Sequence, residues 1–313
     1  MKIPPSTSSK SLFPIIKNGE GVHVIDDKYN RYLDFTGSNN TVILGYFPFL
    51  NNLPPNFPGV SYLEDEVSDI LSKYTKTKHF RYFKNGSDSV SCAIRLARRI
   101  LNNRRAPIFY VGYAGAHNEY ARTINSEGIP DYASYQLNPN ELNEESFESY
   151  NKDSILVYES RYESLLKNFP SKIKICDHLK SGIMGLWEEN NADFNIYGKS
   201  LANGYPVSVI TGRDKYMEEI SNVYYSTTYG GDNVGLHAIK ETINAFTPNI
   251  MLYEKRLSFA KTHLPKWKSI PKEKIQFFTE NKVLFNGHWQ IMLLHTEDQI
   301  MRLSRLCTSA NVL

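Results

Sequence analysis

Short apolar runs separated by turn residues dominate the middle of the chain. Five of them have the length and the β-branched character of strands: PIFYVG (107–112), SILVYE (154–159), KIKICD (172–177), FNIYGK (194–199) and PVSVITG (206–212). Apolar runs of this length between turn signals are typical of strands buried on both faces. Because helix-like sequence also lies between these runs, the pattern predicts an α/β fold with a mainly parallel sheet.

Helical periodicity appears on both sides of these runs. The segments 62–74 and 87–101 each place their apolar residues on one face of a helix. From 233 to about 263 the pattern is helical again, and a last helix is predicted over 297–309.

The two ends of the chain have different patterns. Residues 1–20, which include a serine cluster, are expected to form an arm, and the alternation in 22–37 predicts a hairpin that turns near Asp27. Residues 48–58 form a Pro- and Asn-rich loop. Near the C-terminus, three further runs resemble strands and indicate a small α+β domain: IQFF (275–278), VLFN (283–286) and QIMLLHT (290–296).

Composition narrows the class of protein. Of the 313 residues, 41 % are hydrophobic and 22 % charged, which excludes a chain that is disordered throughout. The net charge of +3 predicts neither a nucleic-acid nor a membrane partner. The spacing of Cys92, Cys176 and Cys307 fits no zinc or disulfide framework, and no HExxH pattern indicates a metal site. Without a signal-peptide pattern or an apolar stretch of about 18 residues, we expect a cytoplasmic protein.

Lys199 and Asp177 each end a predicted strand, at the edge where open α/β sheets bind ligands. A lysine enclosed there loses hydration, which lowers its pKa and makes its amine able to form a Schiff base. Taken alone, Lys199 also fits a solvated lysine, and Asp177 a helix cap or an ion-pair partner. Together they fit a pyridine cofactor, since such cofactors need an acid against the ring nitrogen.

Other polar residues fall at similar places. Asn85, Gly86 and Ser87 begin the helix predicted over 87–101, where free backbone N–H groups bind anions, although ordinary helix capping explains the same residues. Tyr113 follows a strand and suits stacking on a flat ring or simple packing. His117 and His178 fit acid–base groups or ordinary hydrogen-bonding residues. STTYGGDN (226–233) is a second possible anion site or a plain loop.

In this order, the segments resemble the class III aminotransferases. These are fold type I enzymes that use pyridoxal 5′-phosphate (PLP), and the likeness is to the branch around glutamate-1-semialdehyde aminomutase and the aminotransferases of polysaccharide clusters. It runs from about residue 20 to 247 and is carried by these segments: YLDFTGSNNTVILGY, KNGSDSVSCAIRLAR, GYAGAHNEY, NSEGIPDY, YES, ICDHLKSG, YGKSLANGYPVSVITGR and STTYGGD.

The resemblance implies a role for each matching residue. Lys199 would form the Schiff base with PLP and move the proton, and Asp177 would pair with the pyridine nitrogen. The remaining assignments are the phosphate cup at Asn85, Gly86 and Ser87, ring stacking by Tyr113, a cofactor-side His178, and the substrate side at Ser38, Asn39 and Glu159. Thr228 would reach the cofactor of a neighbouring subunit, which makes the expected unit a homodimer with shared active sites.

The resemblance also implies a division of the chain. We expect an N-terminal arm and pocket strand over 1–45, a large PLP-binding domain over 46–247 and a shortened C-terminal domain over 248–313. The sequence departs from the family at Ala114, where histidine is usual, and at His178 and Lys180, which replace glutamate and a neutral residue.

The expected function is that of a PLP-dependent aminotransferase, which moves an amino group from a small-molecule donor to a carbonyl acceptor through Lys199. Two alternatives stay open. An intramolecular aminomutase would turn over without an added donor. A PLP-fold protein that only binds is motivated by Ala114 and the short chain, while the retention of both Lys199 and Asp177 argues against it.

Overall fold

The computed structural model describes residues 13–47, 59–266 and 268–312 and divides into two compact units. One unit combines residues 1–51 with 241–313, and the other contains residues 52–240. The N-terminal and C-terminal segments therefore share one unit, whereas the sequence suggested three consecutive segments. The loop at 48–58 and the first part of the arm lie outside the described residues.

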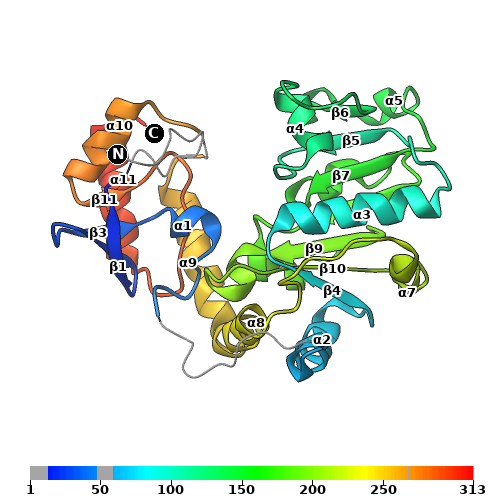
Figure 1. The fold of residues 1–313 in the computed structure, drawn as a ribbon. Helices are drawn as coiled ribbons and strands as arrows, with labels where there is room; N and C mark the ends of the chain where they lie inside the picture. The colour runs from blue at the N-terminus through cyan, green and yellow to red at the C-terminus, as the bar shows by residue number, and fades with distance from the viewer. Residues whose placement is uncertain (1–12, 48–58, 267, 313) are drawn as a thin grey trace. The chain divides into compact units, whose positions relative to one another are not determined.

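The unit formed by residues 52–240 is built on a seven-stranded sheet within the described residues (Figure 1). In spatial order its strands are β4 (Phe80–Phe83), β10 (Ser208–Gly212), β9 (Phe194–Gly198), β8 (Ile173–Asp177), β7 (Ile155–Glu159), β5 (Ile108–Val111) and β6 (Ser134–Gln136). From β9 to β6 all pairings are parallel, and β10 is antiparallel to both of its neighbours. The predicted mainly parallel sheet is confirmed, as are the five predicted strands.

Helices cover this sheet because they present apolar faces to it. The predicted helices are confirmed as α2 (Tyr62–Thr75) and α3 (Gly86–Ile100), and α3 buries Val90, Ile94 and Ala97 in the same core as strand residues of the sheet. Shorter helices fill the connections: α4 (Asn118–Ile124), α5 (Glu144–Phe147), α6 (Glu163–Leu166) and α7 (Asp214–Met217). The division between the units falls inside α8 (Asn233–Phe246).

Parallel pairing brings the carboxyl ends of β7, β8 and β9 to one edge of the sheet. Glu159 is the register partner of Asp177, and Asp177 is the partner of Ile196, three residues before Lys199. The last residues of these strands therefore meet at one place, which is the condition that a site at this edge requires.

The other unit has its own four-stranded sheet within the described residues. The order is β1 (Ile16–Glu20), β2 (His23–Asp26), β3 (Arg31–Asp34) and β11 (Val283–Leu284), with β11 parallel to β3. The antiparallel pair β2–β3 confirms the predicted hairpin. Helices α9 (Ile250–His263), α10 (Lys272–Glu280) and α11 (Glu297–Ser309) also belong to this unit. The predicted last helix is thus confirmed.

Two predictions near the C-terminus are wrong. The run IQFF lies inside α10, where Ile275 and Phe278 bury one helical face. A four-residue apolar run fits either a strand or a buried helix turn, and only length decides between them. The segment 290–296 forms no strand, although single backbone hydrogen bonds join it to Phe35 and Ile43.

The described residues also contain no helix that is long and apolar enough to cross a bilayer.

A left-handed turn follows β3. Four consecutive residues have positive φ angles: Gly37 (51°), Ser38 (49°), Asn39 (61°) and Asn40 (65°). Such a turn places each β-carbon too close to the following carbonyl oxygen, which costs about 1–2 kcal/mol per residue for most side chains. Glycine and asparagine tolerate this conformation best, so Ser38 carries more of the strain than its neighbours do.

Replacing Ser38 tests this strain. We expect Ser38→Gly to raise the free energy of unfolding by about 1 kcal/mol, because glycine adopts φ of 49° without the β-carbon clash. Ser38→Ala keeps the β-carbon and is the matched control, expected to leave the free energy unchanged. Urea denaturation of the three proteins measures the difference. A loss of stability in the glycine variant would contradict the strain.

Candidate functional site

Lys199 begins a 3-10 helix, Lys199–Ala202, directly after β9. Its backbone has a φ of 49°, a left-handed conformation that is unusual for a lysine and is often found at functional sites. Burial lowers the pKa of its amine, and the positive charge of Lys180 lowers it further, while Asp177 and Glu159 oppose this shift. A larger fraction of Lys199 is therefore the neutral, nucleophilic amine than in a solvated lysine.

Asp177 ends β8 and is only 3 % exposed. Burial raises its pKa to about 6, although the Leu179 N–H group and the Lys199 amine both favour the charged form. Its Oδ1 accepts a hydrogen bond from Leu179 N at 2.7 Å. Within the described residues no donor is bonded to Oδ2, so this oxygen is left to pair with a ligand group.

Glu159 is the centre of a charged cluster at the end of β7, and we call it the Glu159 cluster. The cluster consists of Glu159, Lys180, Arg161 and the backbone of Tyr113. Oε1 accepts hydrogen bonds from Lys180 Nζ at 2.5 Å and Tyr113 N at 2.9 Å. Oε2 lies 2.7 Å from Arg161 Nε. Glu159 itself is 3 % exposed, so two cations hold one buried carboxylate beside Asp177.

Leu179 lies between the start of α3 and the segment around Lys199. A β-carbon on Gly86 would lie 2.1 Å from Leu179 Cδ1, and one on Gly198 would lie 2.7 Å from Leu179 Cδ2. Glycine at both positions lets the leucine pack against both backbones as it does here. The leucine therefore contacts both the start of α3 and the residue before Lys199.

Ser87 lies in the first turn of α3, where backbone N–H groups have no partner within the helix. Its Oγ accepts a hydrogen bond from Ala116 N at 2.9 Å, which leaves the hydroxyl proton free to be donated. The Asn85 side chain caps the helix by accepting from Asp88 N at 3.0 Å. The arrangement suits an anion at Gly86 and Ser87, with Asn85 acting as the cap.

Tyr113 follows β5 by two residues and lies beside Glu159. Its backbone N–H donates to Glu159, the residue is 53 % exposed, and its ring packs edge-on against Tyr120. Gly112 before it has a φ of 93°, and a β-carbon there would lie 2.7 Å from Glu159 Cδ. The open face of the Tyr113 ring is thus available for stacking.

His178 takes a different direction from Asp177. Its Nδ1 lies 3.1 Å from Glu188 Oε2 and its Nε2 lies 3.0 Å from Asn195 Oδ1. The ring is fully buried and stacks on Tyr197 at 4.7 Å. Both ring nitrogens therefore have partners within the protein, and the cofactor-side position expected for His178 stays a prediction.

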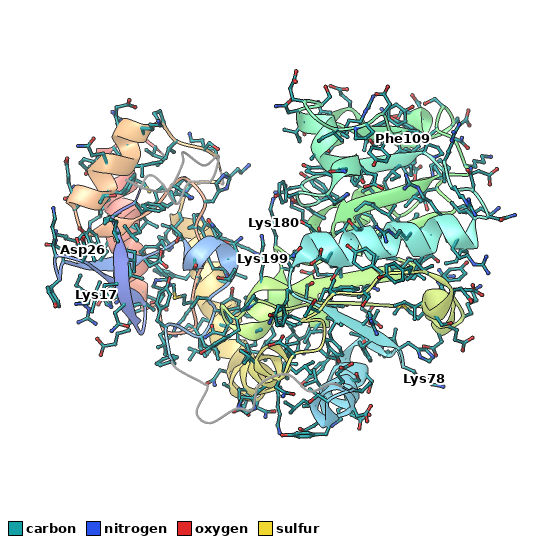
Figure 2. The ribbon with its side chains drawn as sticks, in the orientation of Figure 1. Lys17, Asp26, Lys78, Phe109, Lys180 and Lys199 are labelled. Atoms are coloured by element: carbon teal, nitrogen blue, oxygen red, sulfur yellow. The ribbon has the colours of Figure 1, made fainter. Side chains whose placement is uncertain are left out.

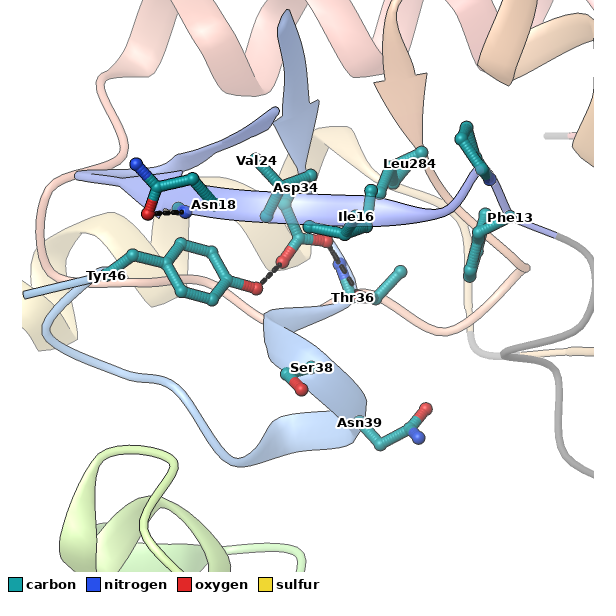
Figure 3. Close-up of a pocket in the computed structure, with 12 residues that line it drawn as sticks. Phe13, Ile16, Asn18, Val24, Asp34, Thr36, Ser38, Asn39, Tyr46 and Leu284 are labelled. Atoms are coloured by element: carbon teal, nitrogen blue, oxygen red, sulfur yellow. Dashed lines mark hydrogen bonds between the residues drawn. The ribbon is translucent and has the colours of Figure 1, made fainter. Parts of the chain in front are cut away.

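Ser38, Asn39 and Thr228 lie outside this set of contacts. Ser38 and Asn39 belong to the other unit, where they line a cavity of about 300 Å³ (Figure 3). In the same cavity the buried Asp34 accepts a hydrogen bond from Tyr46 Oη at 2.6 Å. Thr228 is exposed on the loop that precedes α8. Neither placement tests the roles that the resemblance implies for these residues.

Sequence reasoning missed Lys180 and Arg161 as site residues. Lys180 was visible only as a departure from the family, and Arg161, which follows Glu159 by two residues, gave no signal because no motif marks it. Figure 2 labels Lys180 and Lys199 at the same end of the sheet, and the charge of Lys180 acts on Lys199. Chemically, the site offers a reactive amine, a buried acid with one free oxygen, an anion-binding helix start and an aromatic face.

Known proteins resemble the chain in sequence, although no family model matches it. The glutamate-1-semialdehyde 2,1-aminomutase of Haloarcula marismortui is 25 % identical over 283 residues, covering 73 % of this chain and 62 % of that protein. The acetylornithine aminotransferase of Lactococcus lactis is 22 % identical, covering 80 % and 76 %. The chain thus spans less than two thirds of the length of the haloarchaeal aminomutases that it matches.

Solved structures agree over nearly the whole chain. A transaminase with PLP bound has a TM-score of 0.78 at 17 % identity, covering 99 % of this chain and 94 % of that one. An aminotransferase of Vibrio fluvialis in its PMP-bound form also has a TM-score of 0.78, at 14 % identity, covering 99 % and 95 %. The resemblance predicted from the motifs is confirmed: the homologues of this chain are aminotransferases and glutamate-1-semialdehyde aminomutases, and its fold is that of the fold type I PLP transaminases.

Proposed function

We propose that the chain is a PLP-dependent aminotransferase that moves an amino group between a small-molecule amino donor and a carbonyl acceptor. The observation that carries the proposal is the free Oδ2 of the buried Asp177 beside the reactive amine of Lys199. A protein that only binds a ligand needs neither group at the carboxyl edge of the sheet. The curated relatives, which include an acetylornithine aminotransferase and a 3-aminobutyryl-CoA aminotransferase, support the same reaction class.

The site residues fit PLP by the chemistry of their donors and acceptors. Asp177 Oδ2 would accept a hydrogen bond from a protonated pyridine nitrogen, and the Gly86 and Ser87 backbone with the Ser87 hydroxyl would bind the phosphate. The Tyr113 ring would lie against the pyridine ring. When bound, PLP supplies an aldehyde that condenses with amines and a cationic ring that withdraws electrons from the reacting carbon.

The protein residues then have defined tasks. Lys199 Nζ would hold PLP covalently through its aldehyde carbon, with loss of water, and its free amine would take a proton from the donor's α-carbon and give it back on the cofactor side. Asp177 would favour the protonated ring nitrogen, because its carboxylate stabilises the positive charge. Leu179 keeps Asp177 and the start of α3 in register through its packing between Gly86 and Gly198.

An intramolecular aminomutase is a second candidate. The observation that favours it is that relatives from two haloarchaea, 25 % and 23 % identical, carry the name glutamate-1-semialdehyde 2,1-aminomutase. Turnover in the absence of an added amino donor distinguishes the mutase from the aminotransferase.

We also propose that the chain forms a homodimer. The exposed aromatic residues Tyr224 and Tyr229 on either side of Thr228 support this proposal. We further propose a cytoplasmic location.

Lys199→Ala tests the attachment of PLP. Wild-type protein mixed with PLP should show a visible absorption band, and borohydride should trap a pyridoxyl group on Lys199 that peptide mass spectrometry locates. Lys199→Ala should trap none, whereas Lys215→Ala, which removes an exposed lysine, should behave as wild type. Absence of the band and of bound PLP in the wild type would overturn the proposed function.

Asp177→Asn tests the acid. The variant loses a charge-assisted hydrogen bond to the ring nitrogen, worth about 1.5–3 kcal/mol, so PLP should bind about 10- to 100-fold more weakly. Fluorescence titration of PLP into the apo-protein measures this affinity. Asp193→Asn removes another largely buried acid of the same unit and should leave PLP affinity unchanged. Equal affinities of the Asp177 variant and wild type would contradict the role.

Lys180→Met tests how charge sets the reactivity of Lys199. Four charged side chains determine the electrostatic environment of the Lys199 amine. Asp177, Glu159 and Lys180 act on it directly, and Arg161 pairs with Glu159. Since Lys180 lowers the pKa of the Lys199 amine, its removal should raise that pKa, leave less neutral amine at a given pH, and move the pH midpoint of PLP attachment upward.

The control for this experiment is Lys180→Arg, which keeps the positive charge. The rate of borohydride-trapped attachment is measured from pH 6 to 10 in the wild type and in both variants. The midpoint should move only in the methionine variant. A midpoint that moves downward, or equally in both variants, would contradict the electrostatic effect.

A further inference from the structure

A cavity lined mainly by arginines lies at the far end of α3. Its volume is about 360 Å³, and it is lined by Arg95, Arg98, Arg99, Asn102, Arg104, Asn222 and Val223, all from the unit of residues 52–240. The C-terminal half of α3, the turn after it and the segment after α7 supply these residues. At 1.5 Å rise per residue, this end of the helix is about 20 Å from Gly86. The cavity is therefore separate from the Lys199 site.

The guanidinium groups outnumber the acids that neutralise them. Arg98 pairs with Glu119 at 3.0 Å, and Arg99 pairs with Glu219 at 3.2 Å. Arg95 donates to the carbonyl of Tyr224, which carries no charge. Arg104 is exposed and has no ion pair within the described part of the chain. Four arginines thus face two carboxylates, and an excess of two positive charges remains around the cavity.

One of these arginines has an unused donor. Arg98 is 16 % exposed, and its Nε is buried with no acceptor among the described residues. A buried N–H group without an acceptor is unfavourable, so the ion pair with Glu119 does not satisfy all the donors of Arg98. The helix dipole favours cations at the C-terminal end of α3, which explains why arginines gather there. The dipole does not explain Arg104, which lies beyond the helix, or the unpaired Nε of Arg98.

We propose that this cavity binds a small, soluble molecule that carries a phosphate or diphosphate group. Arginine forks match phosphate oxygens and form two hydrogen bonds at once. A cavity of about 360 Å³ falls within the range of small-molecule sites, and the chain's net charge of +3 gives no sign of a nucleic-acid surface. The proposal is independent of the reaction at Lys199.

Pyrophosphate binding to the PLP-loaded protein tests the proposal. PLP is added first so that the anion site at Ser87 is filled, and titration calorimetry then measures the dissociation constant of pyrophosphate. We expect one site per chain in the wild type and a loss of about tenfold in affinity for Arg104→Gln. Arg99→Gln/Arg104→Gln should lose more. Arg305→Gln, which removes an exposed arginine of α11 and the same charge, should bind as the wild type does.

Three results would overturn the proposal. They are the absence of pyrophosphate binding in the wild type, an equal loss of affinity in Arg104→Gln and Arg305→Gln, and binding only to vesicles that contain phosphatidic acid. Circular dichroism and the PLP absorption band of each variant show that it is folded and loaded. Failure of the cavity to bind pyrophosphate would leave PLP attachment at Lys199 intact, so the two proposals fail separately.

Discussion

The packing of Leu179 between two glycines is the constraint on which the proposed site depends. Gly86 begins α3 and Gly198 precedes Lys199, and a β-carbon on either would overlap the leucine. The backbone N–H group of the same leucine bonds Asp177 Oδ1. One residue therefore contacts the start of α3, Asp177 and the residue before Lys199. The parallel register of β7, β8 and β9 brings their carboxyl ends to one edge of the sheet, and Leu179 packs against the segments that follow β8 and β9 there.

Two carboxylates and three basic side chains lie at this edge: Asp177 and Glu159, with Lys180, Arg161 and Lys199. Asp177 and Glu159 end neighbouring strands, and both are 3 % exposed, so two carboxylates would repel each other in a poorly solvated place. Lys180 and Arg161 hold Glu159 through ion pairs, which leaves Lys199 as the remaining cation near Asp177. Burial raises the pKa of Asp177 to about 6, although the charge of Lys199 favours the ionised form. In the proposed function, a cationic ring nitrogen at Asp177 Oδ2 would favour the ionised form further.

Much of the unit of residues 52–240 could be predicted from sequence because its signals are local. Buried strands and amphipathic helices are visible in apolar runs and periodicity, and the glycines around Lys199 appear in recognisable motifs. The failures share one physical cause, which is that they depend on distant partners. The strand β4 pairs with β10 and was not predicted, and Ile275 and Phe278 form a helix where a short apolar run resembled a strand. The partners of the His178 ring, Glu188 and Asn195, were likewise not visible in the sequence.

The same dependence explains why the family motifs predicted Lys199 and Asp177 but gave no role to Lys180. A motif records which residue types a reaction needs at fixed positions, whereas the effect of a departure depends on what surrounds it. Here the departure places an ammonium group on a buried carboxylate, and that carboxylate is also held by Arg161 and the Tyr113 backbone. A neutral residue at position 180 would leave Glu159 with one cation instead of two, and the balance at Lys199 would change. The Lys180–Glu159 pair therefore belongs to the electrostatic surroundings of Lys199, which a motif does not record.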